Sequence, residues 1–576
     1  MSNTKSVESY ILEKAQAWTT QQFDEETRKR VKYLLDNDLK ELEESFYTDL
    51  DFGTGGLRGI MGVGTNRINK YTLGQATQGL CNYLKEQFGG SGLKVAIAHD
   101  SRNNSKKFAR QVAEVLSANG IHAFLFSDLR PTPELSFAVR YLNCHSGIVL
   151  TASHNPKEYN GYKVYWNDGA QLVPPHDKAV IEHVRQVAID QINFSTNEEL
   201  ITYIDHEIDE AYLKEVVAQC LNNKGKKDLK VVFTPLHGTS VTLLPEALKR
   251  SGFEQIQIVE EQAIPDGNFP TVPSPNPEEA AALDMAVKLA ESSDADMVIG
   301  CDPDADRVGL AVRDLNGNMV LLNGNQTGAV LIYYMLSQLR DSNKLPANGF
   351  IAETVVTSDL IEKIGTGFGL ETKKCLTGFK WIAEMIREAE GQQQYIVGGE
   401  ESYGYLIGDF VRDKDAITSA VLLAEAAAYA KANGGSFFKT LLHIYKDYGY
   451  YLERLIALTK KGKAGLEEIQ AMIERFRNNP PKTLGGSKVT HIIDYKSREI
   501  RDLETGLVTS TNLPASNFIQ FITAEGDKVT ARPSGTEPKI KFYFSVKGKL
   551  DTFEDYNHQT AVLEAKINAF VSDLSL

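Results

Sequence analysis

The 576-residue chain contains little cysteine and little tryptophan, five residues of the first and three of the second. The cysteines are scattered and include no Cys-x-x-Cys pair, so we expect neither a disulfide framework nor a zinc site. Such usage is typical of a reduced cytoplasm. The chain also lacks a basic excess, because 62 Lys and Arg against 76 Asp and Glu give a formal net charge of −14. This balance argues against a general nucleic-acid binder, although a pocket for an anionic small substrate can still be locally basic.

Long hydrophobic runs are missing as well. The longest apolar stretch, residues 416–432, is interrupted by Glu425 and is shorter than a membrane span. The N-terminal residues show no basic segment followed by an apolar one, so we expect no secretion signal and a cytoplasmic location. With 45 Gly, 19 Pro and 42% hydrophobic residues, the composition is that of a globular protein, which excludes collagen-like, disordered and coiled-coil classes.

The chain does contain a repeated alternation of apolar runs and helical patterns. This alternation begins near residue 94, restarts at residue 229 and restarts again at residue 327. Alternating strands and helices predict mostly parallel sheets covered by helices. We therefore predict an α/β fold with three related mixed α/β sheet domains, although the three blocks share no repeat that is visible residue by residue. After the breaker at 478–486 (NNPPKTLGG), short apolar runs and a last helix predict a C-terminal α+β domain.

The predicted number of domains is four, which agrees with a prior of about 150 residues per domain. We place the first domain at 1–206, with an N-terminal helical extension and a serine loop. The second is placed at 207–323 with an acidic loop, the third at 324–462 and the fourth at 463–576.

Alternating acidic residues follow the apolar run at 297–300. Asp302, Asp304 and Asp306 point the same way if this loop is extended. Three carboxylates so close would repel by a few kcal/mol per pair at an effective dielectric constant of ~20, so they require a cation, and oxygen ligands suit Mg²⁺. An EF-hand is excluded because Arg307 stands where that loop needs glycine. The alternative is a solvated acidic turn.

A serine loop, residues 151–156 (TASHNP), follows another apolar run. Ser153 in such a Pro-terminated turn can present an exposed hydroxyl for nucleophilic catalysis, although Ser-His neighbours in loops more often only cap a turn. A Gly-x-Ser-x-Gly elbow is absent from the sequence, so we do not expect a hydrolase triad.

Three further loops carry polar groups suited to a phosphorylated polyol. Residues 532–538 (RPSGTEP) offer an arginine, two hydroxyls and a glycine amide, which form a phosphate cradle or simply a tight turn. Glu400 and Ser402 in GEESYG suit hydrogen bonds to sugar hydroxyls, or else begin a helix. The glycine-rich loop 52–59 (FGTGGLRG) presents Arg58 and does not fit the dinucleotide-binding pattern.

These motifs, in this order along nearly the whole chain, resemble those of the α-D-phosphohexomutase superfamily. The similarity lies in the TASHNP serine loop, the DPDADR metal loop, the GEES sugar loop and the RPSGTEP phosphate loop. The FGTGGLRG segment and the length are similar to the branch that holds phosphoglucomutase-2/phosphopentomutase enzymes and bacterial phosphoglucomutases. The resemblance implies four domains around a central cleft, with one loop from each.

The resemblance also implies a role for each motif residue. Ser153 would be the phosphorylated nucleophile, and together with Asp302, Asp304 and Asp306 it would bind one Mg²⁺ per chain. The substrate would be held by these residues: Glu400, Ser402, Gly378 and Lys380 at the sugar, and Arg532, Ser534, Gly535 and Thr536 at the phosphate that does not react.

Charge-balancing and proton-transfer groups are implied beside the serine. Arg58 and Lys163 would flank it, with Lys163 the preferred acid or base, while His154 is either catalytic or purely structural. Some relatives carry a histidine beyond the sugar loop, and here Tyr403 follows that loop instead. The charged run at 412–415 (RDKD) is expected to be an exposed face.

The implied activity interconverts glucose 1-phosphate and glucose 6-phosphate through a phosphoserine enzyme and glucose 1,6-bisphosphate, which also serves as activator. Mannose phosphate, pentose phosphate or a dual specificity are the alternatives, and synthesis of glucose bisphosphate from a separate donor is a further one. Partners would be small sugar phosphates, without nucleic acid or membrane, and the chain a monomer or small homo-oligomer. Because water must be excluded, the last domain is expected to close as a lid.

Two other classes compete with this interpretation. Asp302-Pro303-Asp304 after a strand resembles the nucleophile loop of haloacid dehalogenases, in which a carboxylate is phosphorylated. A sugar-phosphate binding protein without catalysis is the second competitor. The set of four loops argues against the first, and the presence of Ser153 with all three aspartates argues against the second.

Overall fold

Three sheets of the computed structural model share one strand order. The structure describes residues 8–50, 52, 56–460, 462–534 and 539–576. The common orders are β5-β4-β2-β3, β10-β9-β7-β8 and β15-β14-β12-β13, in which two parallel pairs are extended by one antiparallel strand. The predicted α/β class with three related mixed domains is thus confirmed, and the repeat lies in the topology. The expectation of mostly parallel sheets is too simple, because each of these sheets ends in a strand that turns straight back on its neighbour.

The first sheet extends this order by one strand at each end. Its strands are β1 (Gly56–Ile60), β5 (Tyr159–Trp166), β4 (Ser146–Leu150), β2 (Lys94–His99), β3 (His122–Phe126) and β6 (Ile201–Ile204). Its helices are α4 (Lys70–Phe88), α5 (Ser105–Ala118), α6 (Thr132–Tyr141) and α7 (His176–Gln186). The N-terminal extension forms α1 (Ser9–Ala17), α2 (Glu25–Asn37) and α3 (Leu39–Phe46), whose core of Trp18, Phe23 and Phe46 packs on Tyr71 of α4.

The second and third sheets follow the same plan. The second contains β11 (Met319–Leu322), β10 (Val308–Arg313), β9 (Met297–Cys301), β7 (Lys230–Thr234) and β8 (Gln255–Ile258), with α8 (His206–Ala218), α9 (Leu244–Arg250), α10 (Glu260–Ala263) and α11 (Ala280–Ser292). The third contains β13 (Glu371–Cys375), β12 (Gly349–Thr354), β14 (Gln394–Gly399) and β15 (Tyr405–Ile407), with α12 (Gly324–Asp341), α13 (Leu360–Gly367), α14 (Phe379–Ala389), α15 (Ala416–Ala432) and α16 (Phe437–Tyr448).

The fourth sheet is antiparallel, as expected of a smaller α+β domain. Its strands are β16 (Tyr450–Thr459), β23 (Lys539–Gly548), β22 (Lys528–Pro533), β21 (Ile519–Thr523), β18 (Ser487–Asp494), β19 (Glu499–Asp502), β20 (Val508–Ser510) and β17 (Thr483–Leu484), with helices α17 (Gly462–Asn478) and α18 (Tyr556–Asp573). The domain limits stay predictions, except that β16, expected in the third domain, pairs along its whole length with β23 of the fourth sheet.

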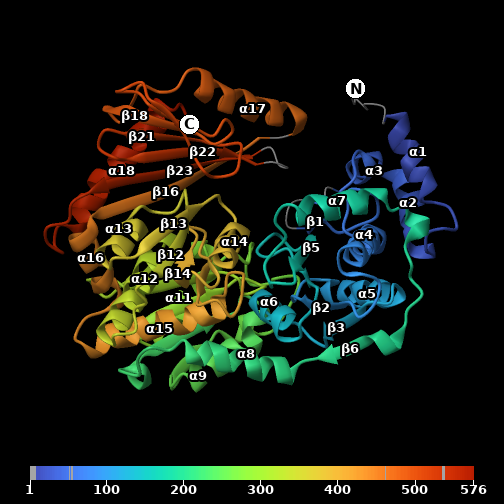
Figure 1. Ribbon diagram of the computed structural model, residues 1–576, viewed down its shortest axis with the longest axis horizontal. Coiled ribbons are helices and arrows are strands. Elements are labelled where there is room, and N and C mark those ends of the chain that lie inside the picture. Colours follow the sequence, from blue (N-terminus) through green and yellow to red (C-terminus); the bar gives the residue numbers. More distant parts are fainter. Residues whose placement is uncertain (1–7, 51, 53–55, 461, 535–538) are drawn as a thin grey trace.

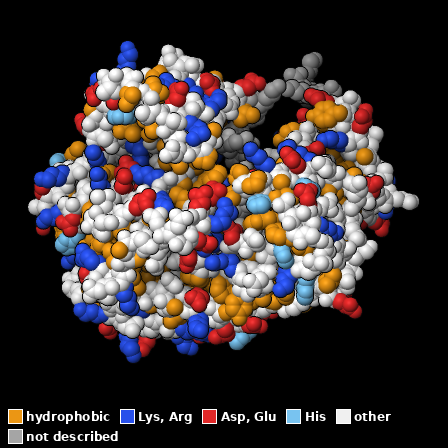
Figure 2. All heavy atoms as spheres, in the orientation of Figure 1, with side chains coloured by type: hydrophobic (Ala, Val, Ile, Leu, Met, Phe, Trp, Pro, Cys, Tyr) orange, Lys and Arg blue, Asp and Glu red, His pale blue; other side chains and the backbone are white. Residues whose placement is uncertain are grey.

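The fourth domain lies over the third and faces the N-terminal helices across the molecule (Figure 1). Figure 2 shows the surface hollowed between the fourth domain and the N-terminal helices. The apolar stretch at 416–432 is helix α15, which packs between the second and third sheets. Its Glu425 is buried in an ion pair of 2.7 Å with Lys226. No helix in the described part of the chain is both long and apolar enough to cross a membrane.

The shared strand order places one loop of each domain in the same structural position. The serine loop connects β4 to β5, the acidic loop connects β9 to β10, and the sugar loop connects β14 to β15. Each loop therefore joins a parallel strand to the antiparallel strand beside it. The carboxyl ends of such strands are where α/β proteins bind ligands.

A buried carboxylate lies where the third and fourth sheets meet. Glu353, at the end of β12, is 1% exposed, and its Oε1 is 3.3 Å from Lys374 Nζ. From the fourth sheet, Lys528 Nζ donates to Asp359 Oδ1 at 3.0 Å. Burial raises the pKa of Glu353 to about 8, with Asp359 acting in the same direction and the two lysines opposing it. Because the folded chain holds this proton more tightly than the unfolded chain, the stability from this group is full below pH 4.5 and is lost as pH rises toward 8.

Replacing Glu353 by glutamine is expected to remove this pH dependence. Between pH 5 and 8 the free energy of unfolding of the native chain should fall more steeply than that of the variant, by up to about 1.4 kcal/mol per pH unit. Urea unfolding at several pH values measures both slopes. Glu362→Gln, in the same cluster but with its side chain 47% exposed, is the control and should keep the native slope. Equal slopes for Glu353→Gln and the native chain would contradict the prediction.

Candidate active site

The acidic loop forms a tight turn that gathers three carboxylates. Asp302 Oδ1 accepts the backbone N–H groups of Asp306 and Arg307 at 3.1 and 3.0 Å. The expected extended loop is therefore wrong, because these bonds fold the loop back on Asp302. The expected convergence is present all the same: one oxygen from each of Asp302, Asp304 and Asp306 lies within 4.8 Å of the others, and all three residues are buried. The alternative of a solvated turn is excluded by this burial.

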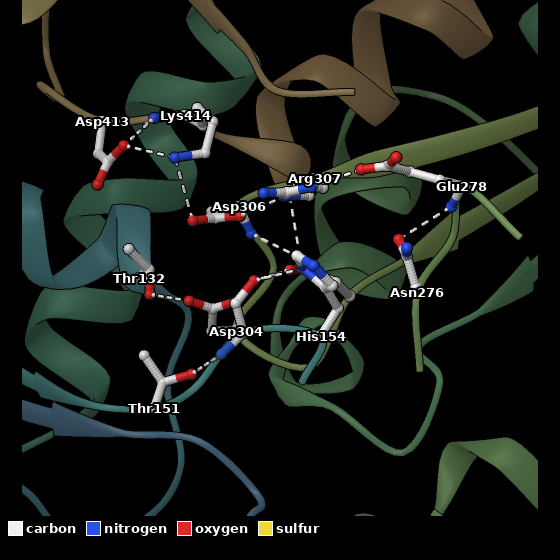
Figure 3. Close-up of polar contacts among 12 residues, drawn as sticks. Thr132, Thr151, His154, Asn276, Glu278, Asp304, Asp306, Arg307, Asp413 and Lys414 are labelled. Atoms are coloured by element: carbon white, nitrogen blue, oxygen red, sulfur yellow. Dashed lines mark hydrogen bonds and ion pairs between the residues drawn. The ribbon is translucent and has the colours of Figure 1, made fainter. Parts of the chain in front are cut away.

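Asp304 and Asp306 each have one carboxylate oxygen engaged by the protein. Asp304 Oδ2 accepts from Thr132 Oγ1 at 2.9 Å and from Lys163 Nζ at 2.7 Å (Figure 3). Asp306 Oδ2 accepts from Lys163 Nζ at 3.1 Å and is 3.2 Å from Lys414 Nζ. The Oδ1 atoms of Asp304 and Asp306 are buried and accept no hydrogen bond from the described residues. Two orphaned carboxylate oxygens beside a third acid form a donor set that fits Mg²⁺.

The electrostatics also indicate a shortage of positive charge. Burial, together with the carboxylates of Asp304 and Asp306, raises the pKa of Asp302 well above its usual range. For Asp306, burial acts in the same direction but is outweighed by Lys163, Lys414 and Arg307, which lower its pKa. At Asp302 the positive charge of the partners is therefore insufficient, whereas at Asp306 it prevails.

Ser153 lies directly against this cluster. Its Oγ donates to Asp302 Oδ2 at 2.7 Å and is 3.1 Å from His154 Nδ1. The residue is 3% exposed, so the expectation of an exposed hydroxyl is wrong: the second domain covers the turn. The backbone of Ser153 has φ of 53°, in the left-handed region that non-glycine residues rarely adopt. Ser153 and Asp302 are 149 positions apart in the sequence, and the fold brings them into contact, as the resemblance implied.

A buried arginine holds the serine loop in place. Arg102, which follows β2 in the sequence HDSR, pairs with Asp100 at 3.4 Å, and both side chains are fully buried. Its guanidinium donates to four backbone carbonyls of the loop, those of Ser153, Asn155, Pro156 and Tyr159. Our sequence analysis missed Arg102. The available signal was its position just after a parallel strand, the same position that the other functional loops occupy.

Exchanging Arg102 for lysine is expected to lower kcat by roughly 10²-fold with a KM change below about 3-fold, because an ammonium cannot hold several carbonyls and the serine loop loses its fixed position. Steady-state kinetics measure this, and thermal unfolding reports the fold. Arg110→Lys, on the outer side of α5, is the control. Native kcat in Arg102→Lys would show that the guanidinium does not position the serine.

Two lysines and an arginine surround the acids. For Lys163, on β5, burial alone would lower the pKa, but Asp304 and Asp306 outweigh burial and raise it, so the ammonium form is held. Lys414 is held as an ammonium in the same way, by Asp306 and Asp413. Arg307 Nη1 pairs with Glu278 at 2.5 Å.

The charged run at 412–415 is not the exposed face that we expected. Arg412 is 1% exposed, and the other three residues of the run are also buried. The reason is that the run passes between the first two domains on its way to α15. Asp413 Oδ2 accepts from Tyr165 Oη at 2.7 Å, and Asp415 accepts from Tyr212 Oη at 2.8 Å while capping α15.

The surroundings of His154 disfavour its protonated form. Burial, followed by the nearby Arg307 and Arg58, lowers its pKa well below 6.5. Arg58 lies on β1 opposite Gly161, and its Nη1 is 3.5 Å from Asn155 Oδ1. Arg58 thus lies beside the serine loop that contains His154, as the resemblance implies.

The sugar loop is a turn and not the start of a helix, so that alternative is wrong. Glu400 Oε1 accepts from the backbone N–H of Gly378 at 2.8 Å, which joins two of the predicted sugar-binding positions. Gly378 has φ of 113°, a conformation that favours glycine, and it precedes α14. The sugar loop also contacts the hairpin of β9 and β10 that carries the three aspartates, because Val308 N donates to Tyr403 O at 3.0 Å. Ser402 lies in the same turn.

The neighbouring Glu401, which our sequence analysis missed, is influenced by charges of the fourth domain. Burial and the charge of Glu400 raise the pKa of Glu401 to about 7, while Lys541 and Arg532 lower it. Arg532 therefore lies close enough to act on the sugar loop.

The remaining predicted residues fall in the third and fourth domains. Lys380, in the first turn of α14, is 3.7 Å from Asp177 of the first domain. Ser534 follows β22, and its backbone N donates to Lys539 O at 2.7 Å. Gly535 and Thr536 lie outside the described residues.

In this repeated α/β fold, a serine is hydrogen-bonded to a buried cluster of carboxylates that fits a divalent cation. Such a combination defines a metal-assisted phosphotransferase. Comparison with known proteins gives the particular family. Profiles described as phosphoglucomutase/phosphomannomutase, alpha/beta/alpha domains I, II and III, match residues 49–189, 210–317 and 323–448. The chain belongs to the phosphoglucomutase/phosphomannomutase family and is an intramolecular phosphotransferase of the isomerase class.

Individual relatives agree with this assignment. A phosphoglucomutase from Staphylococcus aureus (strain USA300) is 40% identical over 535 residues, which cover 92% of this chain and 94% of that protein. A phosphoglucomutase from Staphylococcus haemolyticus (strain JCSC1435) is 37% identical over 516 residues, covering 89% and 92%. Among solved structures, parafusin (phosphoglucomutase) from Paramecium in its open form has a TM-score of 0.67 at 18% identity, covering 92% and 95% of the two chains. A family protein from Burkholderia thailandensis gives 0.66 at 18%, covering 92% and 98%; both structures support the fold alone.

Proposed function

We propose that this chain interconverts glucose 1-phosphate and glucose 6-phosphate, with phosphate carried on Ser153 and glucose 1,6-bisphosphate as the intermediate. The observation that carries the proposal is the 2.7 Å hydrogen bond from Ser153 Oγ to Asp302, inside a cluster with two orphaned carboxylate oxygens. The choice of glucose is supported by relatives that are 37 to 40% identical and named phosphoglucomutase. Mannose phosphate and pentose phosphate are the alternative substrates.

In the proposed site, Asp302, Asp304 and Asp306 hold Mg²⁺, which when bound neutralises charge on the transferring phosphoryl group. A phosphoserine adds a charge of about −1.5 to −2, and this lies beside three carboxylates. Lys163 and Lys414 balance part of that charge directly at Asp304 and Asp306. Arg58 and Arg307 flank the serine loop and the metal turn.

Each transfer breaks the O–P bond at Ser153 and forms one to a sugar oxygen, or the reverse. In the first transfer a sugar hydroxyl loses its proton and the serine oxygen gains one. In the second transfer the serine hydroxyl loses its proton and the other sugar oxygen gains one, so that nothing is consumed over the cycle. Lys163 Nζ already donates to two carboxylates, which supports a function in charge balance and orientation. Ser153 Oγ donates its one proton to Asp302 Oδ2, and His154 Nδ1, at 3.1 Å from Oγ, orients the serine.

The substrate is held, in this proposal, between the third and fourth domains. Glu400 and Ser402 bind sugar hydroxyls, with Gly378 and Lys380 beside them. The phosphate that does not react is bound by Arg532, Ser534, Gly535 and Thr536. Closure of the fourth domain as a lid, a cytoplasmic location and a monomeric or small oligomeric state stay predictions.

Mapping covalent phosphate by peptide mass spectrometry, with and without glucose 1,6-bisphosphate, tests the proposal. An acid-stable phosphate on Ser153 is expected. A hydroxylamine-labile phosphate on Asp302 would support the carboxylate mechanism instead, and absence of phosphate under both conditions would favour a binding protein. Rates on glucose, mannose and ribose 1-phosphates then decide the sugar, and equal rates on ribose and glucose would contradict the preference for glucose.

A further inference from the structure

The second domain supplies the three acids of the metal turn, but the first domain determines how one of them is oriented. Thr132 begins α6 and is completely buried. Its backbone N–H donates to Asp304 O at 2.9 Å, and its Oγ1 donates to Asp304 Oδ2, also at 2.9 Å. In Figure 3, Thr132 and Lys414 approach the acid cluster from different sides.

Hydrogen bonds to Oδ2 restrict the rotation of the Asp304 carboxylate. Its Oδ2 is shared by Thr132 Oγ1 and Lys163 Nζ, so rotation of the carboxylate would break both bonds. Its Oδ1 is thereby turned toward the cluster, where it is buried without a partner among the described residues. Groups that hydrogen-bond a ligand's second atom orient it and commonly change metal affinity by about 10 to 100-fold.

We infer that Thr132 is a positioning residue of the cation site, through which the first domain sets the affinity for Mg²⁺. The inference rests on the proposed function, because it requires Asp304 to be a ligand. Lys163 and Thr132 have separate tasks here: the lysine supplies charge, whereas the hydroxyl supplies only direction. Removal of the hydroxyl should therefore weaken binding without changing the charge of the site.

Thr239 offers a matched control. It is also fully buried, and its backbone N donates to Pro303 O of the same turn at 2.8 Å. Its Oγ1, however, is buried without a hydrogen-bond partner in the described part of the chain. Both threonines therefore anchor the turn through the backbone, and they differ in whether the hydroxyl reaches a carboxylate.

Calorimetric titration of the metal-stripped full chain with Mg²⁺ tests the inference, with thermal unfolding in the absence of metal as the check on folding. Thr132→Val keeps the volume and should raise the Kd for Mg²⁺ by about 10 to 100-fold. Thr132→Ser, which keeps the hydroxyl, and Thr239→Val should both stay within about 3-fold of the native Kd, below the range expected for loss of an orienting group. If Thr132→Val does not fold, Thr132→Ala takes its place with the same expected result.

Native Mg²⁺ affinity in the Val variant would overturn the inference, and so would an equal loss in Thr239→Val, because the loss would then reflect packing around the turn. A native chain that does not bind Mg²⁺ would overturn the cation site itself and with it this inference. If the native chain binds Mg²⁺ but carries no phosphate on Ser153, the proposed function fails while the positioning of Asp304 stands.

Discussion

Replacing Ser153 by alanine is expected to abolish phosphate transfer, with a loss in kcat of at least about 10⁴-fold, because the group that carries the phosphate is removed. The fold should persist, since the substitution deletes one oxygen from a turn that Arg102 holds through backbone carbonyls. Mg²⁺ binding should also persist, because all three carboxylates remain. Coupled-enzyme turnover, Mg²⁺ titration and phosphopeptide mapping measure the three expectations.

Ser127→Ala, in the connection that follows β3 of the same sheet, is the control for this experiment and should behave like the native chain. Near-normal turnover of Ser153→Ala would contradict a phosphoserine mechanism. Loss of turnover together with loss of Mg²⁺ binding would instead make Ser153 a necessary part of the cation site.

The second large effect is expected at Lys163. Its ammonium lies 2.7 and 3.1 Å from carboxylate oxygens of Asp304 and Asp306, which are both buried. Lys163→Met keeps the length of the side chain but leaves these acids without one of their cations. Breaking a buried ion pair in this way costs about 3–5 kcal/mol of stability. We also expect kcat to fall by about 10³-fold, the size of effect seen when one electrostatic group is removed from an active site.

Urea unfolding and steady-state kinetics measure these two effects. Lys163→Arg, which keeps the charge, should recover most of the stability but less of the activity, because its planar fork cannot reproduce the bonds of an ammonium. Lys178→Met, at an exposed position in the first turn of α7, is the control. Native stability in Lys163→Met would show that the two carboxylates do not depend on this lysine.

Local sequence features predicted several parts of the site correctly. Apolar runs followed by polar loops identified the strand ends at Ser153, Asp302 and Glu400, because a buried strand and a polar turn are both visible within ten residues of sequence. The chemistry of the side chains then indicated a divalent cation, since carboxylates at this density require one. The conformation of those loops was less accessible. The acidic turn is folded back by backbone hydrogen bonds to Asp302 Oδ1, and side-chain spacing alone does not reveal such bonds.

Local sequence patterns were sufficient to predict which residue types follow which strands, the α/β class and the order of the functional loops. Three-dimensional packing, in contrast, determines which side chains of these loops meet, that the charged run at 412–415 is buried, and that Arg102 and Thr132 serve the site. This difference follows from the range of the interactions. Strand and helix patterns arise between residues a few positions apart, whereas Thr132 and Asp304 are 172 positions apart and meet only because the loop after β9 packs on the first turn of α6.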